Sequence, residues 1–421
     1  MEKRRVVVTG MGIVSSYGCG VDKFWNSLKE GKSGVRNLTR IPLEGHLVTF
    51  GAEATTFDDE VAQNNLIDAK EFKRMDRFTQ FGVVAADEAV KDSGFDIEKE
   101  DPYRVGVVFG SGAGGFHTFE TQHQNMIQRG PTKCSPFTVP MLINNMVAGR
   151  ISMRHGAKGV NKCVTTACAT SAHCIGDAFR SIQFDDADIV IAGGSEAVLT
   201  NLGVGAFTSA RTLSRRNDDP EHASRPYDID RDGFVMGEGG ACLILEELNH
   251  ALARGAKIYA EIVGYGQTGD AYDMVAPDPS GVGAAKAMEL SVQNAGIKPS
   301  DVDYVNAHGT STHLGDIAES NAIAKVFGDL SVNKNLKVSS TKSMHGHMVG
   351  ATGGAEAIVC IKAINESIIP PTINLVNQDP EVANLDYVPN KAIKKEVKYA
   401  LTNSFGFGGQ NASLLFKKFE K

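Results

Sequence analysis

The segment DRFTQFGVVAADEAVKDSG (76–94) predicts a helix that ends at Gly94, and after a polar linker RVGVVFG (104–110) predicts a buried strand. The same order recurs later in the chain. There GAAKAMELSVQNAG (283–296) predicts a helix that ends at a glycine, and DYVNAHG (303–309) predicts the strand that follows it. Each strand leads into a loop of small residues. A helix, a linker, a strand and a loop repeated in one order indicate an internal duplication.

Two further pairs of segments extend this repeat. Cys168 begins CATSAHCIGDAF and His347 begins HMVGATGGAEAI, and both runs consist of small residues typical of a closely packed helix. Downstream, GEGGACLILEE (237–247) resembles GGQNASLLFKK (408–418). Strands that alternate with helices predict an α/β protein with parallel or mixed sheets covered by helices. We expect two halves related by a pseudo-twofold axis, with the active site where they meet.

The length of 421 residues suits two such halves, which we place at 1–254 and 255–421. A net charge of −7 argues against general nucleic-acid binding, because that function needs an excess of basic residues. No run approaches the roughly 18 apolar residues of a membrane span. The N-terminal run MEKRRVVVTGMGIV is broken by Gly10 and Gly12 and is followed by no cleavage-site pattern, so it predicts a first strand.

Cysteine usage gives an expectation about the compartment. The seven cysteines are odd in number, irregularly spaced and free of CxxC pairs, so a disulfide framework or zinc site is not expected. A reducing, cytoplasmic location fits this pattern better. Nucleotide cofactors are not expected either, since GMGIVS near Gly10 lacks the third glycine of a dinucleotide-binding fingerprint.

Cys168 is the first candidate for chemistry. If a helix starts there, its free N–H groups and its dipole favour the thiolate. The small neighbours Ala167 and Ala169 leave room for an acyl group. A buried structural cysteine is the alternative, and it is the commoner state of cysteine.

NAHGTSTHLGD (306–316) contains a second candidate. His308 ends a predicted strand, a frequent place for catalytic residues in α/β proteins, and Thr310 and Thr312 suit a polar substrate. His308 and His313 lie five residues apart in a loop, which does not fit the helical zinc motif, so we expect no metal. A structural histidine is the alternative.

Two more loops carry polar or glycine-rich motifs. SSTKSMHGHMVGATGG (339–354) offers Lys342, His345 and His347, and a lysine in a confined site can orient charged groups. NSFGFGGQN (403–411) sets phenylalanines among glycines, where backbone N–H groups can face a ligand. The alternatives are a solvated loop and an ordinary glycine-rich turn.

Together these motifs resemble the elongating β-ketoacyl-[acyl-carrier-protein] synthases. The matching pieces are TTACATSAHCIG, YVNAHGTSTHLGD, SSTKSMHGHMVGATGG and NSFGFGGQN, in the family's order and across essentially the whole chain. The closest fit is to the type II synthases of bacterial fatty acid synthesis, although ACATSAHCIG is more similar to the type I relatives. The resemblance implies the thiolase fold, a duplicated α-β-α-β-α architecture, and a condensation that lengthens an acyl chain by two carbons.

The resemblance also implies roles for single residues. Cys168 corresponds to the nucleophile, and His308 and His347 correspond to the two catalytic histidines. Lys342 corresponds to the family lysine, held by Glu319. The residues expected to contact substrate are the gating Phe407, whose N–H joins that of Cys168 in the oxyanion hole, the phosphopantetheine-binding Thr310 and Thr312, and Ala113 and Phe207 of the substrate pocket.

An acidic acyl carrier protein is the implied partner, with both substrates on its phosphopantetheine and no other cofactor. A local basic patch should receive it despite the negative net charge. The family positions place this patch at Lys73, Arg74, Lys133 and Arg211, and ordinary solvated surface is the alternative. The family is usually a homodimer.

Four positions depart from the family pattern. Ala113 stands where a bulky aliphatic residue is usual, which should open the acyl tunnel. Gln410 replaces a threonine, His345 a threonine and His313 a proline. A specialised polyketide or secondary-lipid ketosynthase therefore remains open. A non-catalytic chain-length-factor partner is a further alternative, disfavoured by the intact nucleophile and histidines, and a degradative thiolase fits the motifs poorly.

Overall fold

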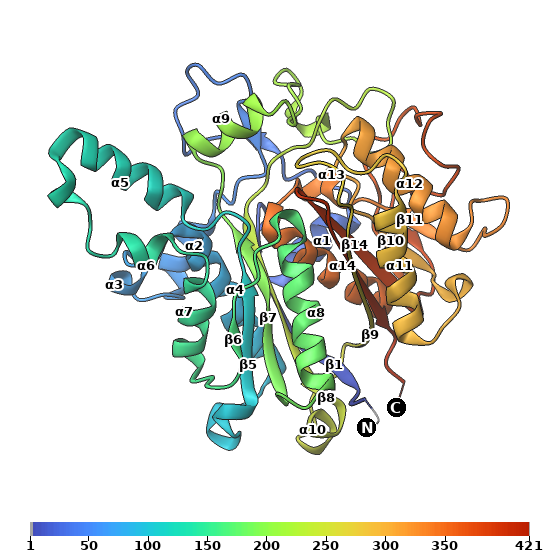
Figure 1. Ribbon diagram of the computed structural model, residues 1–421, viewed down its shortest axis with the longest axis horizontal. Coiled ribbons are helices and arrows are strands. Elements are labelled where there is room, and N and C mark those ends of the chain that lie inside the picture. Colours follow the sequence, from blue (N-terminus) through green and yellow to red (C-terminus); the bar gives the residue numbers. More distant parts are fainter. Residues whose placement is uncertain (1–2, 421) are drawn as a thin grey trace.

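The computed structural model describes residues 3–420, and its strands form two similar sets that meet in the middle of one sheet (Figure 1). From the outer edge inward, the first set is β6 (Asn161–Lys162), β5 (Val105–Gly110), β7 (Ile189–Glu196), β8 (Gly239–Glu247) and β1 (Val6–Ser15). In the same order, the second set is β11 (Lys337–Ser339), β10 (Tyr304–Asn306), β14 (Tyr399–Gly406), β15 (Gln410–Lys417) and β9 (Ala260–Gly269).

The strand directions of the two sets also match. In each set the outer strands pair in parallel, and the inner strands pair antiparallel. The sets join where residues 6–8 of β1 pair with residues 260–262 of β9. The predicted internal duplication is therefore confirmed by strand order and direction. The proposed division at residue 254 lies between α10 (Leu248–Ala253) and β9.

Helices and strands alternate in five layers. The central layer contains α8 (Thr170–Gln183) and α14 (Thr352–Glu366), which pack against each other between the two sets of strands. The outer face of the first set is covered by α4 (Arg77–Ser93) and α7 (Met146–His155), and that of the second by α11 (Val282–Ala295), with α12 (His313–Phe327) against it. This arrangement is the expected thiolase-type α-β-α-β-α fold.

Strand β7 shows why these strands are apolar throughout. Ile189 and Ile191 pack in the cluster that includes α4 and α7, whereas Val190 and Ala192 pack in the cluster that includes α8 and α14. Successive side chains of a strand point to opposite faces, so a strand between two helical layers needs apolar residues at every position. All residues of β7 are accordingly buried.

Helix α4 bears out its predicted ends. Asp76 caps the N-terminus by accepting the N–H of Phe78, and Gly94 ends the helix in the left-handed conformation at φ 66°. The helix lies almost in contact with the β1 backbone, because a Cβ at Gly12 would lie 2.1 Å from the carbonyl oxygen of Ala85. Glycine in β1 thus permits the close packing of helix on strand.

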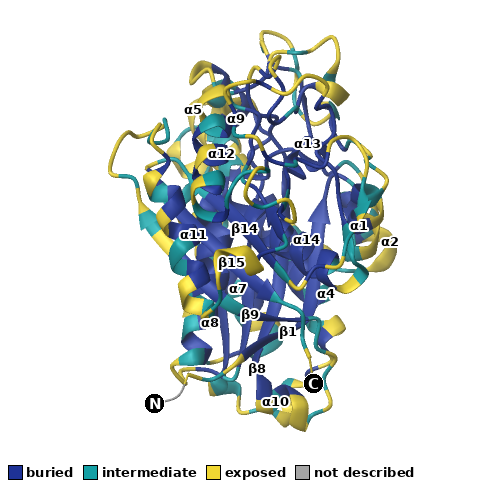
Figure 2. Ribbon diagram, turned by 90° about the vertical axis from the view of Figure 1, so that its right-hand side faces the viewer, coloured by how far each residue is buried: buried dark blue, intermediate teal, exposed yellow. Residues whose placement is uncertain are grey.

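The remaining helices lie around this body. They are α1 (Val21–Lys29), α2 (Phe57–Asn64), α3 (Ala69–Phe72), α5 (Phe116–Arg129), α6 (Thr138–Leu142), α9 (Asn201–Ser209) and α13 (Lys342–His345). Helices α5 and α6 form an arm that projects from the side of the molecule (Figure 1). Figure 2 shows buried loop segments above the strands, close to α13. Within residues 3–420, no helix has both the length and the apolar character of a bilayer span.

Candidate active site

Cys168 lies in a tight turn rather than at the start of a helix. The turn is the 3₁₀ segment η4 (Ala167–Ala169), and α8 begins only at Thr170, so the predicted helix start was two residues early. Ala167 has φ 49°, a left-handed conformation that strains a residue with a side chain. Cys168 is 6% exposed and unpaired.

The corresponding turn in the second half is η7 (Val349–Ala351), followed by α14. It also begins with a left-handed residue, since Val349 has φ 44°. The position that matches Cys168 within this turn is Gly350, not His347 as the sequence pairing suggested. His347 lies three residues earlier, in the connection between α13 and η7.

The thiol of Cys168 faces two backbone N–H groups. Burial raises its pKa, whereas the ammonium of Lys342 and the N–H groups of Phe407 and Cys168 itself lower it. The Phe407 segment is pressed against the turn that carries Cys168, because a Cβ at Gly406 would lie 2.7 Å from the carbonyl oxygen of Thr166. The backbone of the Phe407 segment and the backbone of Cys168 therefore lie close together, and the N–H groups of both lower the pKa of the one thiol.

His308 and His347 lie next to each other. His308 follows β10, and its ring centroid lies 5.3 Å from that of His347, with the rings nearly perpendicular at 87°. Nδ1 of His347 lies 3.0 Å from Oγ1 of Thr352. Burial and then Lys342 hold the pKa of both imidazoles well below the usual range, so both rings are neutral near pH 7.

Lys342 pairs with a residue that the sequence analysis did not select. Its Nζ lies 2.5 Å from Oε1 of Glu356 on α14, and both side chains are almost fully buried. Glu319, the expected partner, instead accepts the backbone N–H groups of His308 (2.8 Å) and Gly309 (2.7 Å). The assignment of Glu319 as the carboxylate that holds Lys342 was wrong. Glu319 fixes the backbone that carries His308.

Glu196 is a second carboxylate that the sequence analysis missed. At the end of β7, it accepts N–H groups of Gly112 (2.8 Å), Ala113 (3.1 Å) and Gly350 (3.1 Å). The first two belong to the loop after β5, and the third to η7 of the second half. Glu196 and Glu356 each stand within a run of small or apolar residues, IVIAGGSE and TGGAEAIV. A charged residue in such a run is the signal that would have identified both glutamates.

The catalytic candidates share one cavity of about 440 Å³. Its lining includes Cys168, His308, His347, Glu319, Phe407, Thr310, Thr312 and Arg211. Oγ1 of Thr310 lies 3.0 Å from Oγ1 of Thr312, so the two hydroxyls form one polar pair on the wall. The structure thus brings together residues from both halves of the chain.

Ala113 and Phe207 lie on the apolar side of Cys168. Both pack against a buried cluster that contains Cys168 and Phe234, and Phe116 packs there as well. The ring of Phe207 lies 5.7 Å from that of Phe234 and 6.3 Å from that of Phe407. An acyl group on Cys168 would meet these side chains.

The four residues of the expected basic patch lie on three separate segments. Lys73 and Arg74 follow α3, and the guanidinium of Arg74 lies 4.9 Å over the ring of Phe137, four residues beyond Lys133. Arg211 lies apart from them, on the cavity wall. Arg74 therefore contacts the arm, Lys133 lies within the arm between α5 and α6, and Arg211 borders the catalytic cavity.

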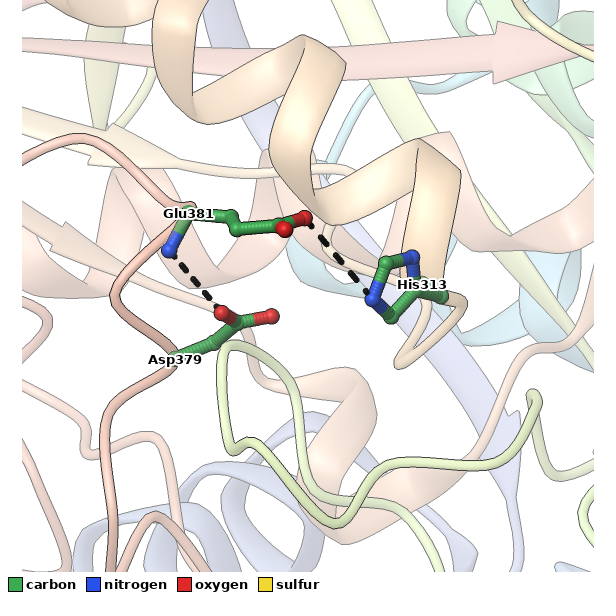
Figure 3. Close-up of side chains that lie close together, drawn as sticks. All are labelled: His313, Asp379 and Glu381. Carbon is green, nitrogen blue, oxygen red and sulfur yellow. Dashed lines mark hydrogen bonds and ion pairs between the residues drawn. The ribbon is translucent and has the colours of Figure 1, made fainter.

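His313 does not join His308 in a metal-binding set. It lies at the start of α12 beside Asp379 and Glu381, with Nε2 of His313 3.9 Å from Oε2 of Glu381 (Figure 3). The carboxylate of Asp379 is already bonded on both oxygens. It accepts the N–H of Glu381 and pairs with Arg231 at 2.7 Å. The cluster therefore joins the exposed His313 and Glu381 to a buried ion pair of Asp379 and Arg231 at the edge of the cavity.

Comparison with known proteins identifies the class. Residues 3–251 match the N-terminal domain of β-ketoacyl synthase, and residues 259–376 match its C-terminal domain. A 3-oxoacyl-[acyl-carrier-protein] synthase 2 from Staphylococcus aureus is 51% identical over 419 residues, which cover 100% of this chain and 99% of the relative. A Synechocystis protein of the same name is 49% identical over 420 residues, with the same coverage.

Solved structures agree with this result. A β-ketoacyl synthase from Burkholderia phymatum is 36% identical with a TM-score of 0.89, and the match covers 99% of this chain and 100% of that one. A type II polyketide ketosynthase, solved with its acyl-carrier protein and bound to the hexaketide, is 32% identical with a TM-score of 0.90 and the same coverage. The chain therefore belongs to the β-ketoacyl synthase family. It is an acyltransferase that joins acyl and malonyl units in the elongating condensation of fatty acid synthesis.

Proposed function

We propose that this enzyme takes both substrates from an acyl carrier protein, with Cys168 as nucleophile and His308 and His347 as the catalytic histidines. The observation that carries this assignment is the single cavity in which the thiol, two converging N–H groups and two neutral imidazoles meet. No free cofactor takes part, because the substrates arrive as thioesters on phosphopantetheine.

The first step transfers the acyl group. The sulfur of Cys168 attacks the carbonyl carbon of the acyl thioester and forms a new C–S bond. The N–H groups of Cys168 and Phe407 stabilise the oxyanion. The bond to the pantetheine sulfur then breaks, and that sulfur leaves with the proton that Cys168 gave up. The fixed position of both donors makes this stabilisation available without reorganisation.

The second step builds the carbon–carbon bond. N–H groups of His308 and His347 donate to the thioester carbonyl oxygen of the malonyl group, carbon dioxide leaves, and the electron pair of the broken bond forms an enolate. The enolate carbon attacks the acyl carbonyl on Cys168, and the sulfur leaves as thiolate and regains a proton. The product is a 3-oxoacyl thioester two carbons longer.

The lowered pKa of both imidazoles suits this step. A neutral ring donates from one nitrogen only, and when Thr352 donates to Nδ1 of His347, the remaining proton lies on Nε2. Burial, and after it the charge of Lys342, keeps both rings neutral, and Glu356 keeps that charge in place. Thr310 and Thr312 would bind the phosphopantetheine arm along the cavity wall.

The surface supports two partners. Lys73 and Arg74 beside the arm, Lys133 within it and Arg211 at the cavity provide positive charge for an acidic carrier protein. The arm itself exposes apolar side chains, among them Ile127 (69% exposed) and Val139 (63% exposed), which supports a homodimer in which a second copy covers the arm.

The unpaired cysteines fit a cytoplasmic location.

A specialised ketosynthase for unusual acyl chains is the second candidate, favoured by Ala113 in the acyl pocket. The identities argue for fatty acid elongation, since the synthase 2 relatives are 51% and 49% identical whereas the polyketide ketosynthase is 32% identical. A silent chain-length factor is disfavoured by the intact catalytic set.

The deciding experiment is intact-protein mass spectrometry after incubation with a panel of acyl-carrier proteins of different chain length. We expect an acyl-sized mass gain that disappears in Cys168→Ala and persists in Cys163→Ala, whose thiol is partly exposed five residues upstream. The panel then ranks the chain lengths. A gain that survives Cys168→Ala, or no gain with any chain, would refute the assignment.

A further inference from the structure

His173 lies behind the nucleophile turn. It is 6% exposed and lies on α8, five residues after Cys168. Its Nδ1 is 2.7 Å from Oγ1 of Thr166, the residue that begins the turn. Thr166 is held further by Thr170, whose hydroxyl accepts its N–H at 2.9 Å. The imidazole therefore contacts the turn through a short side-chain hydrogen bond.

The other side of the imidazole lies beside β15 (Gln410–Lys417), the strand that follows the Phe407 segment, because α8 packs against β15 and His173 lines one groove with Gln410. Burial lowers the pKa of His173, and the charge of Arg180 lowers it further. Asp177 and the carbonyl oxygen of Asn411 act in the opposite direction. Asn411 is the second residue of β15, four residues after Phe407. A neutral ring that accepts from Thr166 at Nδ1 has its proton on Nε2, where it can donate to that carbonyl.

His173 has no place in the catalytic cavity. It lines a separate groove of about 290 Å³ with Thr166, Gln267 and Gln410. Among residues 3–420, the linings of this groove and of the catalytic cavity share no member. The ring of Tyr265 packs edge-on against the imidazole at 6.3 Å. His173 can therefore act on the reaction only through the segments that it joins.

We propose that His173 is a positioning residue that sets the distance between the two N–H donors of the oxyanion hole. One donor belongs to the turn that His173 holds through Thr166, and the other to the segment that runs into Asn411. The imidazole lies between them as a rigid spacer with one acceptor and one donor. This inference rests on the proposed roles of Cys168 and Phe407.

The test separates two half-reactions of the full-length enzyme. Acyl transfer to Cys168, followed by intact mass in single turnover, depends on the oxyanion hole. Decarboxylation of malonyl-carrier protein, followed by carbon dioxide release, depends on the two histidines. A displaced donor should slow acyl transfer in His173→Phe by about 10- to 100-fold, since small misplacements at a reacting centre cost up to about that factor. Decarboxylation should stay within about twofold of wild type.

Three further variants sharpen the test. Thr166→Val removes the hydroxyl with little change of shape, and it should slow the same half-reaction and add little to His173→Phe. His173→Asn places a polar atom near the position of Nδ1 and should restore part of the rate. Tyr265→Phe, which keeps the neighbouring ring and loses only its bond to Gln267, is the matched control and should behave as wild type.

Equal losses in both half-reactions would assign His173 a merely structural role and overturn the proposal. Unchanged acyl transfer in a folded His173→Phe, or additive effects of the two substitutions, would also overturn it. If His173→Phe does not fold, Thr166→Val decides alone by the ratio of the two rates. Absence of acylation in the wild type would instead refute the proposed function, and the inference with it.

Discussion

The buried ion pair of Lys342 and Glu356 gives the sharpest stability prediction. Glu356→Gln leaves the ammonium of Lys342, with a side chain 1% exposed, without its countercharge. Breaking a buried pair by removing one partner costs about 3–5 kcal/mol. With an unfolding entropy of about 2.1 cal/mol/K per residue over 421 residues, this cost lowers Tm by about 3–6 °C.

The assay is denaturant unfolding combined with calorimetry, and the chain offers a matched control on the same helix. Glu366 pairs with Lys362 at 2.8 Å and with Lys29 at 2.9 Å, but its side chain is 30% exposed. Glu366→Gln should therefore cost no more than about 1 kcal/mol. Replacing both buried partners, as Lys342→Met with Glu356→Leu, should restore most of the lost stability, although the charge of Lys342 that acts on the two histidines is then gone.

One result would refute this reasoning directly. If Glu356→Gln costs as little as Glu366→Gln, the Lys342 charge is compensated by other groups and the pair does not organise the site. Equal or greater loss in the double variant would contradict it as well, because the penalty should come from an unpaired charge and not from lost packing.

Three other predictions concern reactivity and binding. Because burial raises the pKa of Cys168, its alkylation rate by iodoacetamide should rise about tenfold per pH unit between pH 7 and 9; a plateau below pH 8 would contradict this. Gly406→Ala would set a Cβ 2.7 Å from the Thr166 carbonyl, so acyl transfer should fall by about 100-fold, and a rate close to wild type would show that the two segments can separate. Lys133→Glu should raise KM for carrier-protein substrates several-fold at low salt and leave kcat unchanged. Lys23→Glu, on helix α1, is the control and should leave KM unchanged. An effect of Lys133→Glu that does not weaken with added salt would exclude a charge-based contact.

The fold was predictable where local signals agree with the global arrangement. Helix α4 carries a cap at Asp76 and a stop at Gly94, and both could be recognised without tertiary information. The repeat of helix, strand and loop was equally visible. Strand β10 was expected from 303 to 309 but ends at Asn306, because the chain turns there to present His308.

The residues with recognisable motifs were expected to meet, and they do line one cavity, whereas the partners that hold them were not predictable. The identity of the carboxylate beside Lys342 depends on which helix crosses behind it, and α14 supplies Glu356 from fourteen residues further along. The start of α8 was also misplaced, since nothing in a run of small residues reveals that Ala167 adopts a positive φ. Contacts between segments distant in the chain come only from packing.

The left-handed residue before each central helix recurs in both halves of the chain. Ala167 begins the turn that holds the nucleophile, and Val349 begins its counterpart, where no nucleophile stands. This left-handed conformation is more strained for a β-branched residue than for alanine, yet Val349 adopts it. The bend therefore belongs to the architecture that the two halves share, and it forms whether or not a cysteine stands in the turn. In the proposed mechanism the same bend then serves two ends, because the first half uses it to hold the acyl group and the second half places beside it the histidines that activate the malonyl unit.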